Sequence, residues 1–247
     1  MNGWLFDLGN TRLKCARLDD AGDAAGTVLA LPHEAEALAL PDDVQGEVAL
    51  VSSVAPEAAR VALLQCLSQR FRRIHLARTL PHCGALTIAY PLPERLGVDR
   101  FLSLLAIADD RRDTLLVGVG TALTIDLLRA DGQHLGGRIA PSPTLMREML
   151  AERSAALPAA GGRYVEFADD TSDALASGCD GAALALIERS MGEAATQLGH
   201  APRLLVHGGG VAALLPMLNT SEPANTEPRT DLVLRGLAHW ARWAGVA

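Results

Sequence analysis

The chain has 247 residues, of which 49% are hydrophobic, and its 22 basic and 29 acidic side chains give a formal net charge of -7. This much apolar surface is enough for a full core and excludes intrinsic disorder, and the length allows one large domain or two smaller ones. Aromatic residues make up only 4% and the basic residues form no run, so neither a stacking platform nor a phosphate-binding stripe for nucleic acid is predicted.

The cysteines and the apolar runs exclude other classes. The 4 cysteines are scattered without a CxxC pair, so neither a zinc site nor a disulfide scaffold is predicted. No apolar stretch reaches membrane-spanning length and no signal-peptide pattern begins the chain. We therefore expect a cytoplasmic protein that does not bind membranes.

Short apolar runs and one helical pattern make up the first half of the chain. Strands are predicted at residues 4–10, 12–18, 26–31, 47–54 and 73–77. Helical spacing of apolar residues predicts a helix over 56–70, and a long helical segment over 100–110 follows a stretch that contains two prolines.

The second half repeats this rhythm of strand, glycine turn, strand, strand and helix. Strands are predicted at 115–120, 121–128, 134–140 and 204–210, and helices at 143–156, 171–199 and 232–243. Residues 156–162 and 220–230 read as loops, the second as a mobile surface loop. The pattern predicts a duplicated α/β unit with domains 1–113 and 114–247 and a cleft between them that the glycine turns face.

Three strand-to-glycine turns carry most of the chemical signal, at 7–11 (DLGNT), 118–122 (GVGTA) and 207–210 (HGGG). Glycine lets backbone N–H groups approach a phosphate without a Cβ in the way. Asn10 and Thr11 can donate to the same oxygens, and Asp7 at the end of a buried strand is placed to hold a hydrated Mg²⁺. One such turn alone is more often a tight hairpin, but three in this order favour a phosphate site. Walker and GxGxxG patterns are absent.

Lys14 is the single lysine among the 22 basic residues. On a strand it shares a face with Asn10 and Arg12, so Lys14 and Asn10 could point at one ligand. A solvated strand lysine is the simpler alternative.

A second constellation lies at residues 90–100 (YPLPERLGVDR), just before an apolar helix. Gly97 opens the backbone ahead of Asp99 and Arg100, and a carboxylate beside a guanidinium can serve as a general base next to an anion anchor. An N-cap Asp with a solvated Arg explains the same spacing equally well.

Taken together, these motifs resemble the type III pantothenate kinases of the acetate and sugar kinase/Hsp70/actin superfamily. The matching segments are DLGNT (7–11), YPLPERLGVDR (90–100), VGTALTID (119–126), HLGGRIAPS (134–142), DTSDALASG (170–178), VHGGG (206–210) and LRGL (234–237). The resemblance covers residues 7–237 and implies two duplicated ribonuclease-H-like (actin-like ATPase) domains with an interdomain cleft. The C-terminal helix would pack back on the first domain.

The resemblance also implies an activity, the ATP-dependent phosphorylation of pantothenate that begins coenzyme A synthesis. By family analogy Asp99 is the general base. The implied pantothenate-binding residues are Tyr90, Gly97, Val98, Asp99, Arg100 and Thr171. The implied ATP-binding residues are Asp7, Leu8, Gly9, Asn10, Thr11, Arg12, Leu13, Lys14 and Thr121, and Asp7 would organise Mg²⁺ through water.

Two positions depart from the family pattern. Gly118 stands where the family carries an Asp associated with its monovalent cation, K⁺ or NH₄⁺, and Ser142 stands where glycine is usual. The resemblance further implies a homodimer, and the helix that follows Arg100 is apolar on more than one face, as an interface helix would be. A helix buried within one chain gives the same pattern.

Two other functions fit parts of the sequence. One is a non-catalytic transcription accessory factor of the same fold, which the glycine at position 118 favours. The other is a superfamily kinase or phosphatase that acts on a sugar or an acid, although such an enzyme would give no reason for the GVDR element at 97–100.

Overall fold

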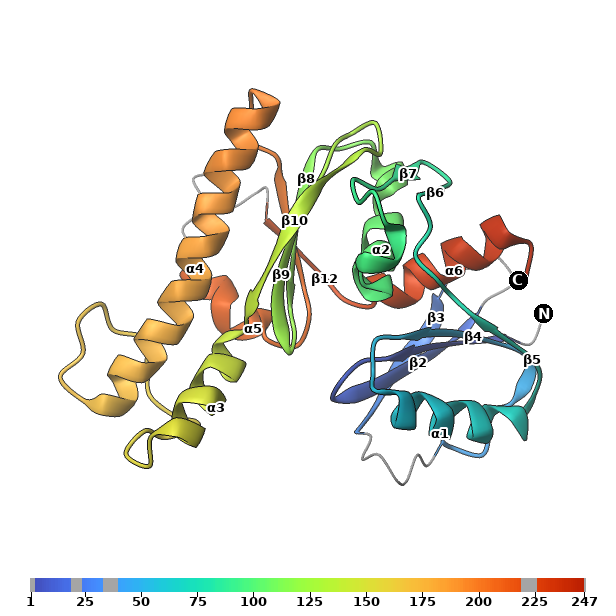
Figure 1. Cartoon of the computed structure of the whole chain (residues 1–247), viewed down its shortest axis with the longest axis horizontal. Helices are drawn as coiled ribbons and strands as arrows, with labels where there is room; N and C mark the ends of the chain where they lie inside the picture. The colour runs from blue at the N-terminus through green and yellow to red at the C-terminus, as the bar shows by residue number, and fades with distance from the viewer. Residues whose placement is uncertain (1–2, 19–23, 33–39, 219–225, 247) are drawn as a thin grey trace. The chain divides into compact units, whose positions relative to one another are not determined.

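Figure 1 shows the computed structural model, which describes residues 3–18, 24–32, 40–218 and 226–246. The chain divides into two compact units. The first comprises Met1–Arg111, Ala130–His134 and Asp231–Ala247, and the second comprises Arg112–Arg129 and Leu135–Thr230.

The first unit is built on a five-stranded mixed sheet with strand order β3-β2-β1-β4-β5. Its strands are β1 (Gly3–Leu8), β2 (Arg12–Leu18), β3 (Ala24–Pro32), β4 (Gly46–Ser53) and β5 (Phe71–Leu76). β1 pairs antiparallel with β2 through the first glycine turn and parallel with β4, and β4 pairs parallel with β5. All five strands are predicted from the sequence, and the structure confirms them.

Alternation along β1 sends its side chains to two different layers. Trp4, Phe6 and Leu8 join the core against helix α1 (Glu57–Ser68). Leu5 and Asp7 therefore face the opposite side of the sheet, which carries helices α2 (Val98–Leu105) and α6 (Leu232–Ala244). The fold thus places a carboxylate on the face of the sheet that carries α2, the helix whose N-cap and first turn are the GVDR element.

Helices α2 and α6 cross at very short range. A Cβ added to Gly236 of α6 would lie 1.9 Å from the carbonyl oxygen of Leu102 in α2, so only glycine allows this approach. The predicted long helix over 100–110 is wrong in length, because α2 ends at Leu105 and a 3₁₀ turn (Ala108–Asp110) follows it. The apolar faces of α2 are buried within the chain, in part against α6, and so do not by themselves indicate a dimer.

The connection between β5 and α2 contains short elements that sequence patterns did not predict. They are β6 (His82–Cys83), β7 (Leu86–Thr87) and the 3₁₀ helix η1 (Pro93–Arg95). The hairpin around residue 132 joins them, since Gly132 has a positive φ of 87° and packs on the carbonyl of Ala85. This contact places His134 in the first unit.

The second unit repeats the sheet of the first, with strand order β10-β9-β8-β11-β12. Its strands are β8 (Thr114–Val119), β9 (Ala122–Leu128), β10 (His134–Pro141), β11 (Arg203–His207) and β12 (Thr226–Arg229). β8 pairs antiparallel with β9 and parallel with β11, as β1 does with β2 and β4. The structure therefore confirms the duplicated α/β architecture.

Strand β12 corrects the predicted loop over 220–230, of which residues 220–225 lie outside the described residues. Its sequence TEPR lacks apolar residues, but it pairs in parallel with β11 at the edge of the sheet. Pro228 is tolerated at such an edge, and Glu227 accepts ion pairs from Arg112 and Arg203. Tertiary pairing thus overrides a loop-like composition.

Two helices of the second unit follow the sequence pattern closely, α3 (Pro143–Arg153) and α4 (Thr171–Leu198). The short helix α5 (Val211–Leu214) and the 3₁₀ turn η3 (Leu215–Met217) are not predicted from the sequence. Ser142 is the N-cap of α3 and accepts a hydrogen bond from the N–H of Leu145 at 3.2 Å, which gives this departure from the family pattern a local role. A 2.7 Å ion pair from Arg147 to Asp180 ties α3 to α4. Among the described residues, no helix combines the length and hydropathy that crossing a bilayer requires.

We expect Gly236→Ala to lower the free energy of unfolding by roughly 1–3 kcal/mol or more, because the new methyl group must push α6 away from α2. Gly192→Ala is the matched control. Gly192 also lies within a helix, α4, but a Cβ at this position would meet no atom within 4 Å. That change should stabilise the protein by about 0.5–1 kcal/mol. Urea unfolding measures both, and equal effects would show that the α2–α6 contact is not a constraint.

Candidate active site

The first glycine turn closes the β1–β2 hairpin with a hydrogen bond from the N–H of Gly9 to the carbonyl of Arg12 at 3.0 Å. Asn10, Thr11 and Arg12 are exposed on this turn. Leu8 and Leu13 flank it with side chains in the core, so only their backbone groups could contact a ligand. The turn thus presents polar groups to solvent from a rigid base.

Asp7 lies one residue before the end of β1, on the face that carries α2 and α6. It is 9% exposed and pairs in register with Lys14 of β2 and Ser52 of β4. Burial raises the pKa of Asp7 from 3.8 to about 7, against the charge of Lys14, which lowers it, and with that of Asp99, which raises it further. A cation bound at this carboxylate would offset the desolvation.

Asp99 lies in the first turn of α2, whose N-cap is Gly97. Its carboxylate accepts the N–H of Arg100 at 2.9 Å, and a Cβ at Gly97 would lie 2.6 Å from the same oxygen. Glycine at 97 therefore makes room for the carboxylate of Asp99. The alternative of an N-cap Asp with a solvated Arg is wrong on both points, since Gly97 is the cap and Arg100 is only 6% exposed.

Tyr90 contacts both Arg100 and His134, a residue that the sequence did not single out. The guanidinium lies 6.0 Å from the Tyr90 ring centroid and donates to its hydroxyl at 3.4 Å. The fully buried ring of His134 also stacks on Tyr90, with centroids 6.1 Å apart and planes at 18°. Nδ1 of His134 accepts the N–H of Ala89 at 3.4 Å, so the buried imidazole orients Tyr90.

No sequence signal identified His134, because a single histidine at the start of an apolar strand has many ordinary roles. Its contact with Tyr90 depends on the hairpin at Gly132, which returns the chain to the segment before α2.

The second unit carries the other two glycine turns side by side. The N–H of Gly120 bonds to the carbonyl of Ala122 at 3.0 Å and leaves Thr121 exposed at the tip. Gly208, with a φ of 105°, packs against the carbonyl of Val119. Thr171 is exposed at the first residue of α4, which Asp170 caps by accepting the N–H of Ser172 at 2.8 Å.

Gly118 occupies in β8 the place that Asp7 occupies in β1, and it pairs with Thr124 and His207 in the same way that Asp7 pairs with Lys14 and Ser52. A Cβ at Gly118 would lie 2.6 Å from Oγ1 of Thr124 and 2.9 Å from Nε2 of His207. The space next to Gly118 is therefore taken by a hydroxyl and an imidazole, and a carboxylate would not fit without their movement.

The structure thus brings together two sets of the predicted residues within the first unit. Asp7, Lys14 and Asp99 interact electrostatically, and Arg100 contacts Tyr90. Thr121 and Thr171 belong to the second unit and lie on different elements of it. In the described part of the chain no three His, Cys, Asp or Glu side chains form a metal-binding group.

The sequence model of one family, described as Type III pantothenate kinase, matches residues 4–193. A curated protein of Stenotrophomonas maltophilia (strain K279a) named Type III pantothenate kinase is 56% identical over 98% of both chains.

Two solved structures are similar in fold. A protein of Campylobacter jejuni described as a Baf family transcriptional activator has a TM-score of 0.63 at 21% identity and covers 99% of this chain and 100% of its own. An archaeal actin homologue has a TM-score of 0.51 at 9% identity, over 98% of this chain and 99% of its own. At these identities they show the actin-like fold alone.

We expect Asp7→Asn to stabilise the protein most at high pH. Between pH 4 and 7 the unfolded chain has released the Asp7 proton while the folded chain retains it, so stability falls as pH rises through this range and stays low above it. With about three units between the two pKa values, the substitution should add up to roughly 4 kcal/mol at pH 8 and less at pH 5. Urea unfolding without Mg²⁺ measures this.

Asp109→Asn, which removes an exposed carboxylate, is the control for the change in net charge. If Asp7→Asn and the control show the same dependence of stability on pH, ionising the buried Asp7 does not lower the stability of the folded protein, and the prediction is wrong.

Proposed function

The chain belongs to the type III pantothenate kinase family, and on that premise we propose that it transfers the γ-phosphoryl group of ATP to the primary hydroxyl of pantothenate. The product, 4'-phosphopantothenate, is the first intermediate of coenzyme A synthesis. The observation that carries the proposal is the GVDR element at the start of α2, where Gly97 makes room for the carboxylate of Asp99 beside the buried Arg100.

In this proposal Asp99 accepts the proton of the attacking hydroxyl. Phosphoryl transfer needs mainly positioning and charge stabilisation, to which a well-placed base adds. Arg100, held against Tyr90, supplies a positive charge for the pantothenate carboxylate. Gly97, Val98 and Thr171 would complete the pantothenate site.

The ATP phosphates would bind at the glycine turns rather than on a cluster of positive side chains. Backbone N–H groups of residues 8–13, the side chains of Asn10 and Thr11, and Thr121 of the second turn are the proposed contacts. Lys14, whose charge acts on Asp7, is the one lysine available. A chain of net charge -7 can therefore bind a polyanion.

Mg²⁺ fits the chemistry of Asp7. This ion keeps most of its waters and needs one or two protein carboxylates besides phosphate oxygens. When bound, it would neutralise charge on the phosphates, and Asp7 would hold it through water. The buried carboxylate, costly to ionise without a cation, supports this assignment.

A monovalent cation has less support here than the family resemblance implies. The space beside Gly118 is filled by Thr124 and His207, so the carboxylate of the family pattern has no counterpart at this point of the chain. We therefore propose that K⁺ or NH₄⁺ activates this protein weakly or is held by other groups.

The regulatory alternative is not favoured. The likeness to the Campylobacter jejuni protein lies at 21% identity and concerns the fold alone, whereas the matched family and the relative at 56% identity are named kinases. Asp7, Asn10, Thr11, Asp99 and Arg100 are all retained, which an accessory factor would not need.

We also propose a homodimer that forms through the second unit. Phe167 is 97% exposed, and we place it at the proposed contact because other exposed apolar side chains occur in the same unit. Other exposed apolar side chains lie on α3, on the strand that leads into it, and on the segment between α3 and α4. They are Ile139, Met149, Leu150 and Val165.

Asp99→Asn should lower kcat by about 10²–10⁴-fold while the fold is retained, because the amide cannot accept the hydroxyl proton. A coupled assay of ADP release with pantothenate measures this, and a melting curve checks the fold. The same assay with Na⁺ in place of K⁺ tests the cation proposal. Asp109→Asn is the control, and near-normal turnover of Asp99→Asn would place the base elsewhere.

His134→Ala should raise KM for pantothenate by about tenfold and leave kcat and KM for ATP nearly unchanged, because the stack that orients Tyr90 is lost. His134→Phe retains an aromatic ring under Tyr90 and should recover most of the affinity. Steady-state kinetics with each substrate varied in turn separate the effects. An equal rise in KM for both substrates would point to general destabilisation instead.

Phe167→Glu should convert the dimer to a monomer, since a charge would be buried at the contact. Light scattering after size exclusion gives the mass of each form. Trp243→Glu, at a half-exposed aromatic residue of the first unit, is the control and should remain dimeric. A monomeric wild-type protein, or a dimeric Phe167→Glu variant, would refute this surface.

A further inference from the structure

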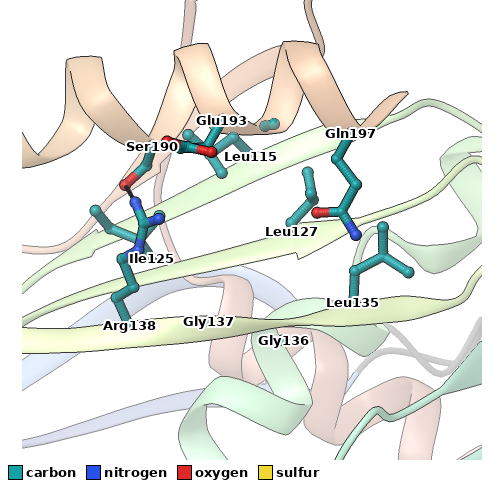
Figure 2. Close-up of a pocket in the computed structure, with 11 residues that line it drawn as sticks. Leu115, Ile125, Leu127, Leu135, Gly136, Gly137, Arg138, Ser190, Glu193 and Gln197 are labelled. Atoms are coloured by element: carbon teal, nitrogen blue, oxygen red, sulfur yellow. Dashed lines mark hydrogen bonds between the residues drawn. The ribbon is translucent and has the colours of Figure 1, made fainter. Parts of the chain in front are cut away.

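The second unit contains a cavity of about 220 Å³ between its sheet and the last turns of α4 (Figure 2). Leu115, Ile125, Leu127 and Leu135 form an apolar floor. Leu115 lies at the start of β8 and Leu127 near the end of β9, whereas the glycine turn at Thr121 joins the other ends of these strands. The cavity is therefore separate from the glycine turns of this unit.

Small residues create the space. Gly136 and Gly137 line the cavity from β10, an edge strand of the sheet, and Gly136 has a φ of 112° that favours glycine. A Cβ at Gly136 would meet no atom within 4 Å. On the helix side, Ala194 faces the cavity with a single methyl group. The cavity therefore exists because small residues line it, and no side chain has to move to open it.

A positive charge lies at one end of the apolar floor. Nη1 of Arg138 donates to the hydroxyl of Ser190 (Figure 2). This hydroxyl in turn donates to the carbonyl of Leu186 at 2.6 Å. Within the described residues no carboxylate lies within ion-pair distance of Arg138. Glu193, the acidic residue of the cavity wall, instead lies 3.5 Å from Arg189.

Arg138 is half-buried beside apolar side chains, and the hydroxyl of Ser190 is its side-chain partner among the described residues, so its guanidinium is a favourable place for an anion. Charge-assisted hydrogen bonds to a carboxylate are stronger than those to neutral groups, and the planar guanidinium matches a carboxylate with two parallel bonds. The adjoining floor of leucine and isoleucine side chains suits a hydrocarbon group. Such a mixture of an apolar lining with few polar groups is typical of small-molecule sites.

We propose that this cavity binds a small monocarboxylate with a branched or cyclic hydrocarbon body. The carboxylate would lie on Arg138 and the body over Leu115, Ile125 and Leu127. Since a dry cavity of about 150 Å³ accepts benzene, this one has room for roughly six to ten non-hydrogen atoms, which excludes a nucleotide.

Calorimetric titration of the full-length protein with 4-methylpentanoate, and with the neutral 4-methylpentanamide, tests this proposal. The carboxylate should bind at least tenfold more tightly than the amide, because only it can pair with the guanidinium. Arg138→Gln should weaken binding of the carboxylate by about tenfold or more. Arg153→Gln, which removes an exposed charge from α3, should leave it unchanged.

A second variant tests the cavity itself. Ala194→Leu should fill the space and abolish binding of the carboxylate, and a melting curve shows whether the variant is folded. If it is not, the comparison of Arg138→Gln with Arg153→Gln still decides. Equal affinity for acid and amide, no binding at about 10 mM, or unchanged binding by Arg138→Gln would each overturn the proposal. The titration measures binding alone, so its outcome is independent of the proposed kinase activity.

Discussion

The contact between α6 and α2 at Gly236 is the constraint on which the first unit depends. The backbone of α6 meets the carbonyl of Leu102 so closely that a single methyl group would separate the helices. Asp99 and Arg100 lie in the first turn of α2, so the C-terminal helix, the last in the sequence, fixes where these two side chains lie. The position of the proposed base is therefore set by a residue far from it in the chain.

Duplication has kept the backbone of the two units and changed the chemistry at equivalent points. The penultimate residue of β1 is a buried carboxylate, Asp7, whereas the penultimate residue of β8 is Gly118. The partner position on the neighbouring parallel strand is Ser52 in one unit and His207 in the other. The shared topology brings equivalent positions to the carboxyl ends of the strands in both units. At the position before the last residue of the first strand, the first unit has an acid, Asp7, and the second unit has Gly118.

Much of the fold could be predicted from the sequence because the signals are local. Apolar runs that end in glycine turns identified most strands, and helical spacing identified α1, α3, α4 and α6. The motifs at 7–11 and 90–100 indicated the family, and the family match bears this out. These features depend on neighbours in the chain, which is why they can be recognised without a structure.

By itself, then, the sequence determined the duplicated α/β fold, its family and the residue types of the candidate site. Only the tertiary structure decided which residues touch. It made a strand of the polar segment at Thr226–Arg229 by pairing it with β11, buried Arg100, and placed His134 beneath Tyr90. The space beside Gly118 was likewise filled from a distant strand. Each of these outcomes depends on contacts between segments far apart in the chain, and local composition carries no record of such contacts.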